Sequence, residues 1–248
     1  MSGHSKWASI KRDKGANDAK RGQLFTKFGR EIAVAARDGA DLSMNSRLRL
    51  AVQRARDANM PSDTIDRAIK RGAGAGDGAN YQEISYEGYG PNGVAVLVDV
   101  LTDNRNRTVS EVRHVFNRNG GNLGETGSVR WLFNQRGVIT AAPDGHDPDE
   151  VGLLAIDAGA DDVQVEDDSL IVYTDTGNME GVRHALEDAS IQVTGSEATM
   201  VPTMTVELDE ESAQRMMRLI ERLEELDDVQ RVFSNSEVND EVAASLAG

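Results

Sequence analysis

The segment Gly72-Ala73-Gly74-Ala75-Gly76-Asp77-Gly78 separates two regions of different hydrophobic periodicity. Glycine loses more backbone entropy on ordering than any other residue, so four glycines in seven positions favour a linker over a helix or a strand. Apolar residues recur at helical spacing before this segment and follow a strand-like pattern after it. We therefore place the first domain boundary here and predict a helical domain over residues 1–75.

Three amphipathic helices are predicted within this first domain, because apolar residues recur there at helical spacing in three segments. Met60-Pro61 precedes the third segment and marks its start. The connections between the segments are short, which favours a small bundle. The predicted helices cover 23–39 and 48–55, and the third begins near Ser62.

The region after the linker alternates between strand and helix patterns. Residues 94–101 form a near-continuous apolar run rich in valine, which predicts a buried strand. Thr108-Val109-Ser110-Glu111 has the pattern of a capping box, so a helix is expected to start there and to end at Gly120-Gly121. Residues 129–140 then predict one or two further strands.

The C-terminal half contains two further units with both helix and strand patterns. Residues 148–201 predict a helix, two strands and a second helix, with prolines at the edges. The final segment repeats a strand, helix and strand order, and its strands over 204–208 and 229–233 are expected to complete the sheet begun by residues 94–136. The predicted fold class is α+β, with the domains 1–75, 80–140 plus 203–240, and an inserted domain 141–202.

Charge is distributed unevenly along the chain, whose net charge is −15. Residues 1–72 carry 16 Lys and Arg against 8 Asp and Glu, which leaves 11 basic and 34 acidic residues in the remainder. Because the Debye length is about 8 Å at physiological salt, an acidic lobe would not cancel the field of a separate basic lobe. A polyanionic partner for the basic third is therefore compatible with the acidic total.

The composition excludes several classes of protein. The chain has no cysteine, which excludes a disulfide framework, a thiolate metal site and a cysteine nucleophile. No apolar run approaches the roughly 20 residues of a membrane span, and the N-terminus has no apolar stretch of a signal peptide. We therefore expect a cytoplasmic protein without a membrane partner.

Residues Gly88-Tyr89-Gly90-Pro91-Asn92-Gly93 match the G-x-G-x-x-G pattern of dinucleotide sites, but their context differs. In a phosphate-binding turn the glycines follow a strand and open a helix. Here they precede the predicted strand, and Pro91 is a turn signal. The pattern therefore predicts a tight strand-to-strand turn.

Catalysis, metal binding and a cofactor are not indicated by any other motif. Neighbouring acidic residues such as 166–168 and 209–211 are typical of solvated turns or helix N-termini. The histidines lie far apart, without the spacing of metal ligands on a helix. We expect no enzyme, no cofactor and no small-molecule substrate; an enzyme with an unrecognised site in an interdomain cleft is a third hypothesis without support from a motif. The histidines are His4, His114, His146 and His184.

The first thirty residues form a dense basic arm, with Asp13 and Asp18 as the only acidic residues. Cations placed on phosphates release counterions, so binding to nucleic acid would depend steeply on salt. Trp7 offers a face for base stacking, although an anchor to its own bundle explains it equally well. A purely solvated basic surface is the alternative for the arm. The candidate contacts are Lys6, Trp7, Lys11, Arg12, Lys14, Lys20, Arg21, Lys27 and Arg30.

Further basic residues cluster in the predicted helices and in one loop. Arg67, Lys70 and Arg71 share a face of the third helix, and Arg49 and Arg56 share a face of the second. A loop over residues 103–107 precedes a predicted helix N-terminus, which suits phosphate contact, although a capping turn alone would explain it. This loop adds Arg105 and Arg107 to the candidate nucleic-acid-binding residues.

Several blocks in the first 140 residues resemble the YebC/PmpR family in order and spacing. The resemblance implies an N-terminal helical bundle followed by two α+β domains. It also implies a role in gene expression, described for some members as promoter binding and for others as a link to ribosomes, including a mitochondrial translational activator. One departure is Asp13, which dilutes the charge of the arm. The blocks are 1–11, 18–22, 25–27, 59–61, 86–91, 102–108 and 120–124.

Two functions follow as hypotheses. The leading one is a DNA-binding transcriptional regulator whose arm and basic helix faces contact phosphates. The alternative is a ribosome-associated translation factor that binds ribosomal RNA and helps the translation of proline-rich stretches, with its acidic domains facing basic ribosomal proteins. The sequence shows no helix-turn-helix spacing, zinc finger, RRM or KH signature that would decide between them.

Overall fold

The computed structural model of the 248-residue chain describes residues 18–74, 81–166 and 169–247. These residues form two compact units, each assembled from segments far apart in the sequence. The first unit comprises 18–74, 81–129 and 209–234, and the second comprises 130–166, 169–208 and 235–247.

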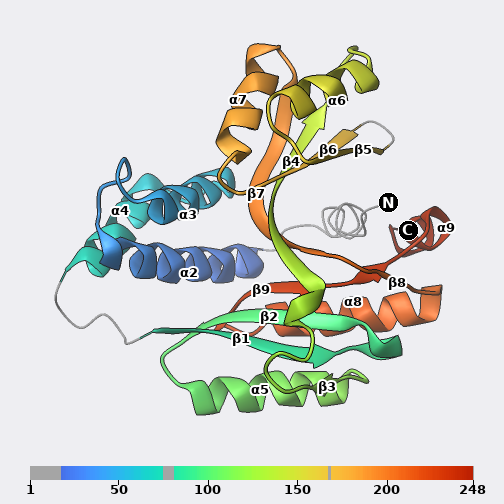
Figure 1. Cartoon of the computed structure of the whole chain (residues 1–248). Helices are drawn as coiled ribbons and strands as arrows, with labels where there is room; N and C mark the ends of the chain where they lie inside the picture. Colours follow the sequence, from blue (N-terminus) through green and yellow to red (C-terminus); the bar gives the residue numbers. More distant parts are fainter. Residues whose placement is uncertain (1–17, 75–80, 167–168, 248) are drawn as a thin grey trace. The chain divides into compact units, whose positions relative to one another are not determined.

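Helices α2 (Asp18–Ala35), α3 (Ser46–Asp57) and α4 (Ser62–Ala73) form the bundle at the start of the first unit (Figure 1). The three predicted helices are confirmed, but the first begins at Asp18 rather than at residue 23. Its first turn is polar, so no apolar period marks it, although Ala, Lys and Arg are good helix formers. A short 3₁₀ helix, η1 (Ala36–Asp38), extends α2. The bundle core includes Ile32, Leu48, Ala51, Val52, Ala55, Ile65 and Ala68.

Close packing of α4 on α2 depends on Gly72, the first glycine of the linker segment. A Cβ atom at this position would overlap the backbone carbonyl of Ala33 and the side chain of Ala36. Backbone atoms cannot move aside as a flexible side chain can, so the two helices would have to separate. The sequence therefore uses this glycine for packing within the bundle as well as for the start of the linker.

We predict that Gly72→Ala lowers the free energy of unfolding by about 1–3 kcal/mol, the usual cost of overpacking. Helix propensity alone would raise it by up to about 1 kcal/mol. Gly22→Ala is the matched control, since Gly22 is exposed on α2 and a Cβ there meets no atom within 4 Å. Urea denaturation of both variants should therefore give shifts of opposite sign, and equal shifts would contradict the packing argument.

The first unit also contains a four-stranded sheet in the order β3-β1-β2-β9. The strands are β1 (Gln82–Tyr89), β2 (Ala95–Thr102), β3 (Asn122–Leu123) and β9 (Val229–Ser234), and neighbours are antiparallel. The buried strand predicted over 94–101 is confirmed as β2. The C-terminal strand also joins this sheet, because β9 pairs with β2.

Two helices, α5 (Arg105–Arg118) and α8 (Glu210–Glu224), pack on this sheet and against each other (Figure 1). The predicted capping box at Thr108 is wrong. Asn104 is the N-cap residue, and its side chain accepts a hydrogen bond from the Arg107 backbone N–H at 3.1 Å. Thr108 lies inside the first turns of α5, where its hydroxyl donates to the carboxylate of Asp228.

The glycine pattern at 88–93 forms the turn between β1 and β2, as predicted. A short 3₁₀ helix, η2 (Pro91–Gly93), connects the strands, and the Gly90 N–H donates to the Val94 carbonyl at 2.8 Å. Gly93 adopts a φ of 74°, in the left-handed region that favours glycine. The pattern thus serves a β-hairpin.

The second unit is built on a sheet in the order β5-β6-β4-β7, all antiparallel. Two helices, α6 (Pro148–Asp157) and α7 (Met179–Asp188), pack on it (Figure 1). Both helices and the two strands that follow α6 match the expectation. The strands are β4 (Phe133–Ala142), β5 (Asp162–Glu166), β6 (Ser169–Thr174) and β7 (Gln192–Pro202).

Two features of this sheet differ from the sequence analysis. Strand β7 was not predicted, because its eleven residues include few apolar side chains and one glycine. Strand β4 pairs with β6 and β7, whereas residues up to 140 were assigned to the preceding domain. The second unit accordingly begins at Arg130, with the 3₁₀ helix η3 (Arg130–Leu132), rather than at residue 141. An apolar run in the sequence predicts a strand but does not indicate which sheet the strand joins.

The remaining elements of the second unit are β8 (Val206–Glu207), β10 (Ser236–Glu237) and α9 (Asp240–Ala247). The two strands pair in parallel with each other. The expectation that a strand over 204–208 completes the first sheet is therefore wrong, and only β9 does so. In the described ranges, no helix combines the length and the apolar character needed to cross a membrane.

Candidate nucleic-acid interface

Helices α3 and α4 present three basic side chains to solvent. Arg56 on α3 and Lys70 and Arg71 on α4 are exposed and have no hydrogen-bond or ion-pair partner within the described part of the chain. Lys70 and Arg71 occupy the last turn of α4, where positive charge is favoured by the helix dipole. These three cations are available for a polyanion.

Two other predicted cations on these helices are used locally. Arg49 donates to the Leu42 carbonyl at 2.8 Å and to the Ser43 carbonyl at 3.3 Å, so it holds the connection that precedes α3. Arg67 donates to the Asp63 carbonyl at 3.1 Å and to the Thr64 hydroxyl at 3.0 Å within α4. Both side chains are exposed to solvent, but each already makes hydrogen bonds within the helical bundle.

Two of the basic residues predicted on α2, Lys27 and Arg30, contact the acidic segment 224–228. Lys27 is only 9% exposed, and its ammonium donates to the Glu224 carbonyl at 2.5 Å. Arg30 donates to the Asp227 carbonyl at 2.7 Å and to Asp228 Oδ1 at 3.2 Å. These side chains tie α2 to the end of α8, so the prediction that they contact phosphate is not supported by their geometry.

Arg21, in the first turns of α2, is exposed to solvent, unlike Lys27. Its guanidinium lies 5.5 Å from the centre of the Phe25 ring. This cation–π contact does not neutralise the charge of the guanidinium. Lys20 lies in α2 as well. Five predicted contacts lie outside the described residues: Lys6, Trp7, Lys11, Arg12 and Lys14.

Asp228 is the acidic centre of the first unit. It is 3% exposed and accepts hydrogen bonds from the hydroxyls of Thr102 at 3.0 Å and Thr108 at 2.7 Å. Arg107 pairs with the same carboxylate at 2.7 Å, and Arg30 reaches its other oxygen. Burial by itself raises the pKa of Asp228, but the hydrogen bonds from Arg107, Thr108 and Thr102 outweigh it, so the pKa is lowered.

Arg105 and Arg107 were predicted to lie in a loop before a helix. This placement is wrong, because both residues belong to the first turn of α5. Arg107 is held by Asp228 and by Asp103 at 3.0 Å, and these hydrogen bonds raise its pKa. Arg105 is exposed, and its carbonyl accepts from the Tyr86 hydroxyl at 3.4 Å. Of this pair, Arg107 is therefore a structural residue.

The exposed face of α5 carries basic residues that the sequence analysis did not select. Arg113, His114 and Arg118 are exposed and lack a partner within the described ranges. Helix α5 contains four arginines and one carboxylate, Glu111, in a region of the chain that is otherwise acidic. The local signal was present in the sequence, but counting charge over whole domains concealed it.

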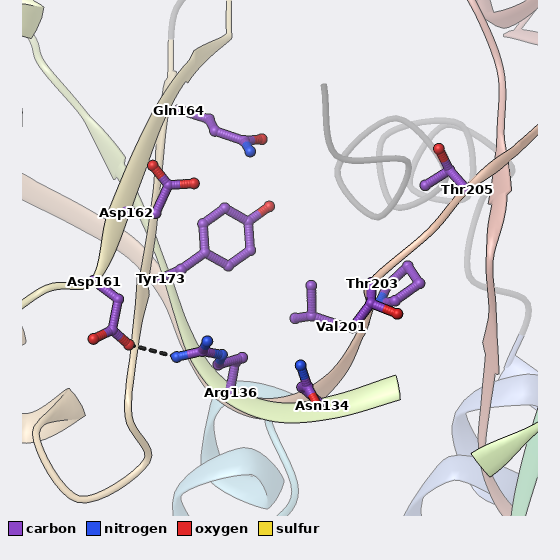
Figure 2. A pocket seen from close by; sticks show the side chains of 10 residues that line it. Asn134, Arg136, Asp161, Asp162, Gln164, Tyr173, Val201, Thr203 and Thr205 are labelled. Carbon is purple, nitrogen blue, oxygen red and sulfur yellow. Dashed lines mark hydrogen bonds and ion pairs between the residues drawn. The ribbon is translucent and has the colours of Figure 1, made fainter. Parts of the chain in front are cut away.

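The second unit has the opposite electrostatic character. Residues 130–208 contain three arginines, no lysine and 16 acidic residues. A cavity of about 300 Å³ in this unit is lined by Asp161, Asp162, Gln164 and Tyr173, among others (Figure 2). Its one arginine, Arg136, is paired with Asp161 at 2.6 Å. This cavity therefore offers acceptors and negative charge, which do not suit a phosphate backbone.

A helical bundle and two antiparallel sheets with packed helices define a multidomain α+β protein. It carries unpartnered cations on α3 and α4 and an acidic second unit. The chain belongs to the TACO1/YebC family. Residues 5–75 match the family's N-terminal domain, and residues 81–236 match its second and third domains. These matches confirm the three-domain α+β fold and the family resemblance seen in the sequence.

Two relatives of similar length have the same protein name. A protein of Pelotomaculum thermopropionicum is 52% identical over 97% of this chain and all of its own length, and one of Roseiflexus castenholzii is 56% identical over 98% of both chains. Each is named a probable transcriptional regulatory protein. The crystal structure of a conserved hypothetical protein from Aquifex aeolicus is 46% identical, with a TM-score of 0.78 over 90% of this chain and 93% of that one.

Proposed function

We propose that the protein is a DNA-binding transcriptional regulator that contacts phosphates through its first unit and performs no catalysis. The observation that carries the proposal is the set of exposed, unpartnered cations Arg56, Lys70 and Arg71 on α3 and α4. Most other cations described here are engaged by carboxylates or carbonyls, so these three supply uncompensated positive charge. The description of the relatives as probable transcriptional regulators supports the same function.

Electrostatics limits the proposed contact to the first unit. With 16 acidic residues against three arginines, residues 130–208 repel a phosphate backbone. Arg183 in this unit is also paired, with Glu180 at 2.8 Å and Glu187 at 2.7 Å. The proposal therefore assigns the second unit no phosphate contact.

The first test measures salt-dependent binding to a 30-base-pair DNA duplex of mixed sequence. Each cation that neutralises a phosphate contributes about 0.9 to the slope of log K against log salt. The triple variant Arg56→Gln, Lys70→Gln, Arg71→Gln should therefore flatten the slope by roughly 2–3 and weaken binding at least about tenfold at low salt. Fluorescence anisotropy between about 50 and 200 mM salt gives both quantities.

A matched control separates local contact from total charge. Arg183, Arg215 and Arg222 are paired with glutamates, so their replacement by glutamine removes the same formal charge from neutralised sites. This control should retain the wild-type slope. Equal slopes for wild type and the α3–α4 variant would remove these helices from the interface, and a wild-type chain that does not bind duplex DNA would overturn the proposed function.

A ribosome-associated translation factor is the second candidate, favoured by the acidic second unit. The 16 acidic residues in the sequence 130–208 suit basic ribosomal proteins, a use that the DNA model does not provide. Ultraviolet cross-linking in living cells, followed by sequencing of both recovered DNA and recovered RNA, distinguishes the two. Enrichment of promoter DNA supports the leading proposal, whereas enrichment of ribosomal RNA at one site supports the translation factor.

A further inference from the structure

The outward face of α5 combines basic and amide side chains along one stripe. Asn106, Ser110, Arg113 and Asn117 are exposed and are spaced at i, i+4, i+7 and i+11, so they lie on the same side of the helix. The opposite side is buried against the sheet through Thr108, Val112 and Phe116. The stripe therefore faces away from the body of the first unit.

The Ser110 hydroxyl donates to the Asn106 carbonyl at 2.9 Å within α5, whereas the longer side chains of the stripe are not used within the unit. Arg113 and Asn117 have no hydrogen-bond partner among the described residues, and the same holds for the neighbouring His114 and Arg118. Only Glu111 opposes their charge on this helix. By contrast, Arg215 and Arg222 on the adjacent α8 are both paired with glutamates of their own helix or its end. The cations beside the stripe are thus unpaired, whereas two of the three arginines of α8 are paired with glutamates.

Helix α5 holds these side chains on a rigid support. Phe116 is fully buried beneath the stripe, and Asn104 caps the helix N-terminus. Arg107 fixes the first turn through Asp228 at 2.7 Å. An interface placed on a helix that is anchored at its start and along its length loses little conformational entropy on binding.

We propose that α5 is the element that reads base edges in the major groove of duplex DNA, with Arg113 and Asn117 as the reading residues and Arg118 on the phosphate backbone. Arginine pairs with the O6 and N7 atoms of guanine, and asparagine pairs with the N6 and N7 atoms of adenine. The B-DNA major groove admits an α-helix, whereas the major groove of A-form RNA is deep and narrow. This inference rests on the proposed DNA-binding function and supplies the groove-reading element that the sequence motifs lacked.

The experiment begins with selection by the full-length wild-type chain from a library of random 30-base-pair DNA duplexes. Affinities for the enriched sequence and for a scrambled duplex are then compared between variants. For Arg113→Ala with Asn117→Ala, we expect the wild-type preference to fall at least about tenfold, because two base contacts are lost. Binding to the scrambled duplex should change only by the loss of one charge.

The control variant is Gln214→Ala with Arg215→Ala on α8. It also replaces one exposed arginine and one exposed amide side chain, but its arginine is paired with Glu211. It should keep the wild-type sequence preference. Protection of guanine N7 from dimethyl sulfate adds a direct test of the groove, since N7 lies in the major groove; wild type should protect it and Arg113→Ala should not.

The outcomes separate this inference from the proposed function. If the wild-type chain binds duplex DNA in an α3–α4-dependent manner but enriches no sequence, α5 is not a reader and the proposed function stands. Retained preference in the α5 variant would also overturn the inference. If an RNA duplex of the same sequence binds as tightly as DNA, major-groove reading is wrong. No binding to duplex DNA would overturn the proposed function itself. Circular dichroism of each variant confirms that a lost preference does not come from unfolding.

Discussion

Replacing Phe116 by alanine is expected to lower the free energy of unfolding by about 3–5 kcal/mol, the range observed for truncation of a buried phenylalanine. Phe116 is completely buried between α5 and the first sheet. A Cβ atom on Gly88 of β1 would come within 2.8 Å of the Phe116 ring, so the glycine leaves the space that the ring occupies. The surrounding backbone is held by strand pairing and cannot collapse into the cavity.

Hydrogen exchange provides a readout that is specific to the first unit. Amides of β1 and β2 should exchange faster in Phe116→Ala, while those of β4 and β6 in the second unit should keep their rates. His114→Ala is the control on the same helix, because His114 is exposed and has no partner in the described part of the chain. It should change stability by less than about 0.5 kcal/mol. A uniform change across both sheets would contradict this local account.

Replacing Asp228 by asparagine should cost roughly 3 kcal/mol, because it removes a buried negative charge and replaces one of the two oxygens that accept from four donors by an NH2 group. Thr102 and Thr108 would be left without a carboxylate, and Arg107 would lose its closest partner. Asp103→Asn is the matched control. Asp103 also pairs with Arg107, but its side chain is 47% exposed, so its loss should cost less than about 1 kcal/mol. Urea denaturation of both variants measures the difference, and equal costs would contradict the assigned role of burial.

The contribution of Asp228 should depend on pH in a defined direction. Its pKa is lowered in the folded chain relative to the usual value. The carboxylate therefore stabilises the fold above the pKa of the unfolded state, about 3.9, and the stabilisation is lost as the pH falls through the folded-state pKa. The stability gap between wild type and Asp228→Asn should be constant above about pH 5 and should narrow below about pH 4. A gap that widened on acidification would exclude this mechanism.

Local sequence signals located most of the secondary structure. Helices α3 and α4, strand β2 and the turn at 88–93 were predicted because apolar period, proline and glycine act within a few residues. Strand β7 was missed because its residues lack a strand-like pattern. The start of α5 was misplaced because both Asn104 and Thr108 can cap a helix, and only the tertiary contact of Thr108 with Asp228 distinguishes them.

The candidate interface was predicted only in part. Arg56, Lys70 and Arg71 are exposed as expected, since one helical face can be read from local spacing. Lys27, Arg30 and Arg107 have the same residue types and a similar sequence context. However, Lys27 binds the backbone carbonyl of Glu224, and the two arginines bind the carboxylate of Asp228. Arg113 and Arg118 were overlooked, although they are exposed and unpartnered in the described structure. Residue type alone therefore does not separate cations that bind partners from cations that hold the fold.

The sequence by itself determined the family, the three-domain α+β class and the contrast between a basic first third and an acidic remainder, because these properties depend on local order and composition. Only the tertiary structure decided which cations remain available. Arg30 and Asp228 are 198 positions apart, and Thr108 and Asp228 are 120 positions apart. Such contacts form only when folding brings β9 beside β2, and a charge is neutralised by the carboxylate that is nearest in space, whatever its distance along the chain.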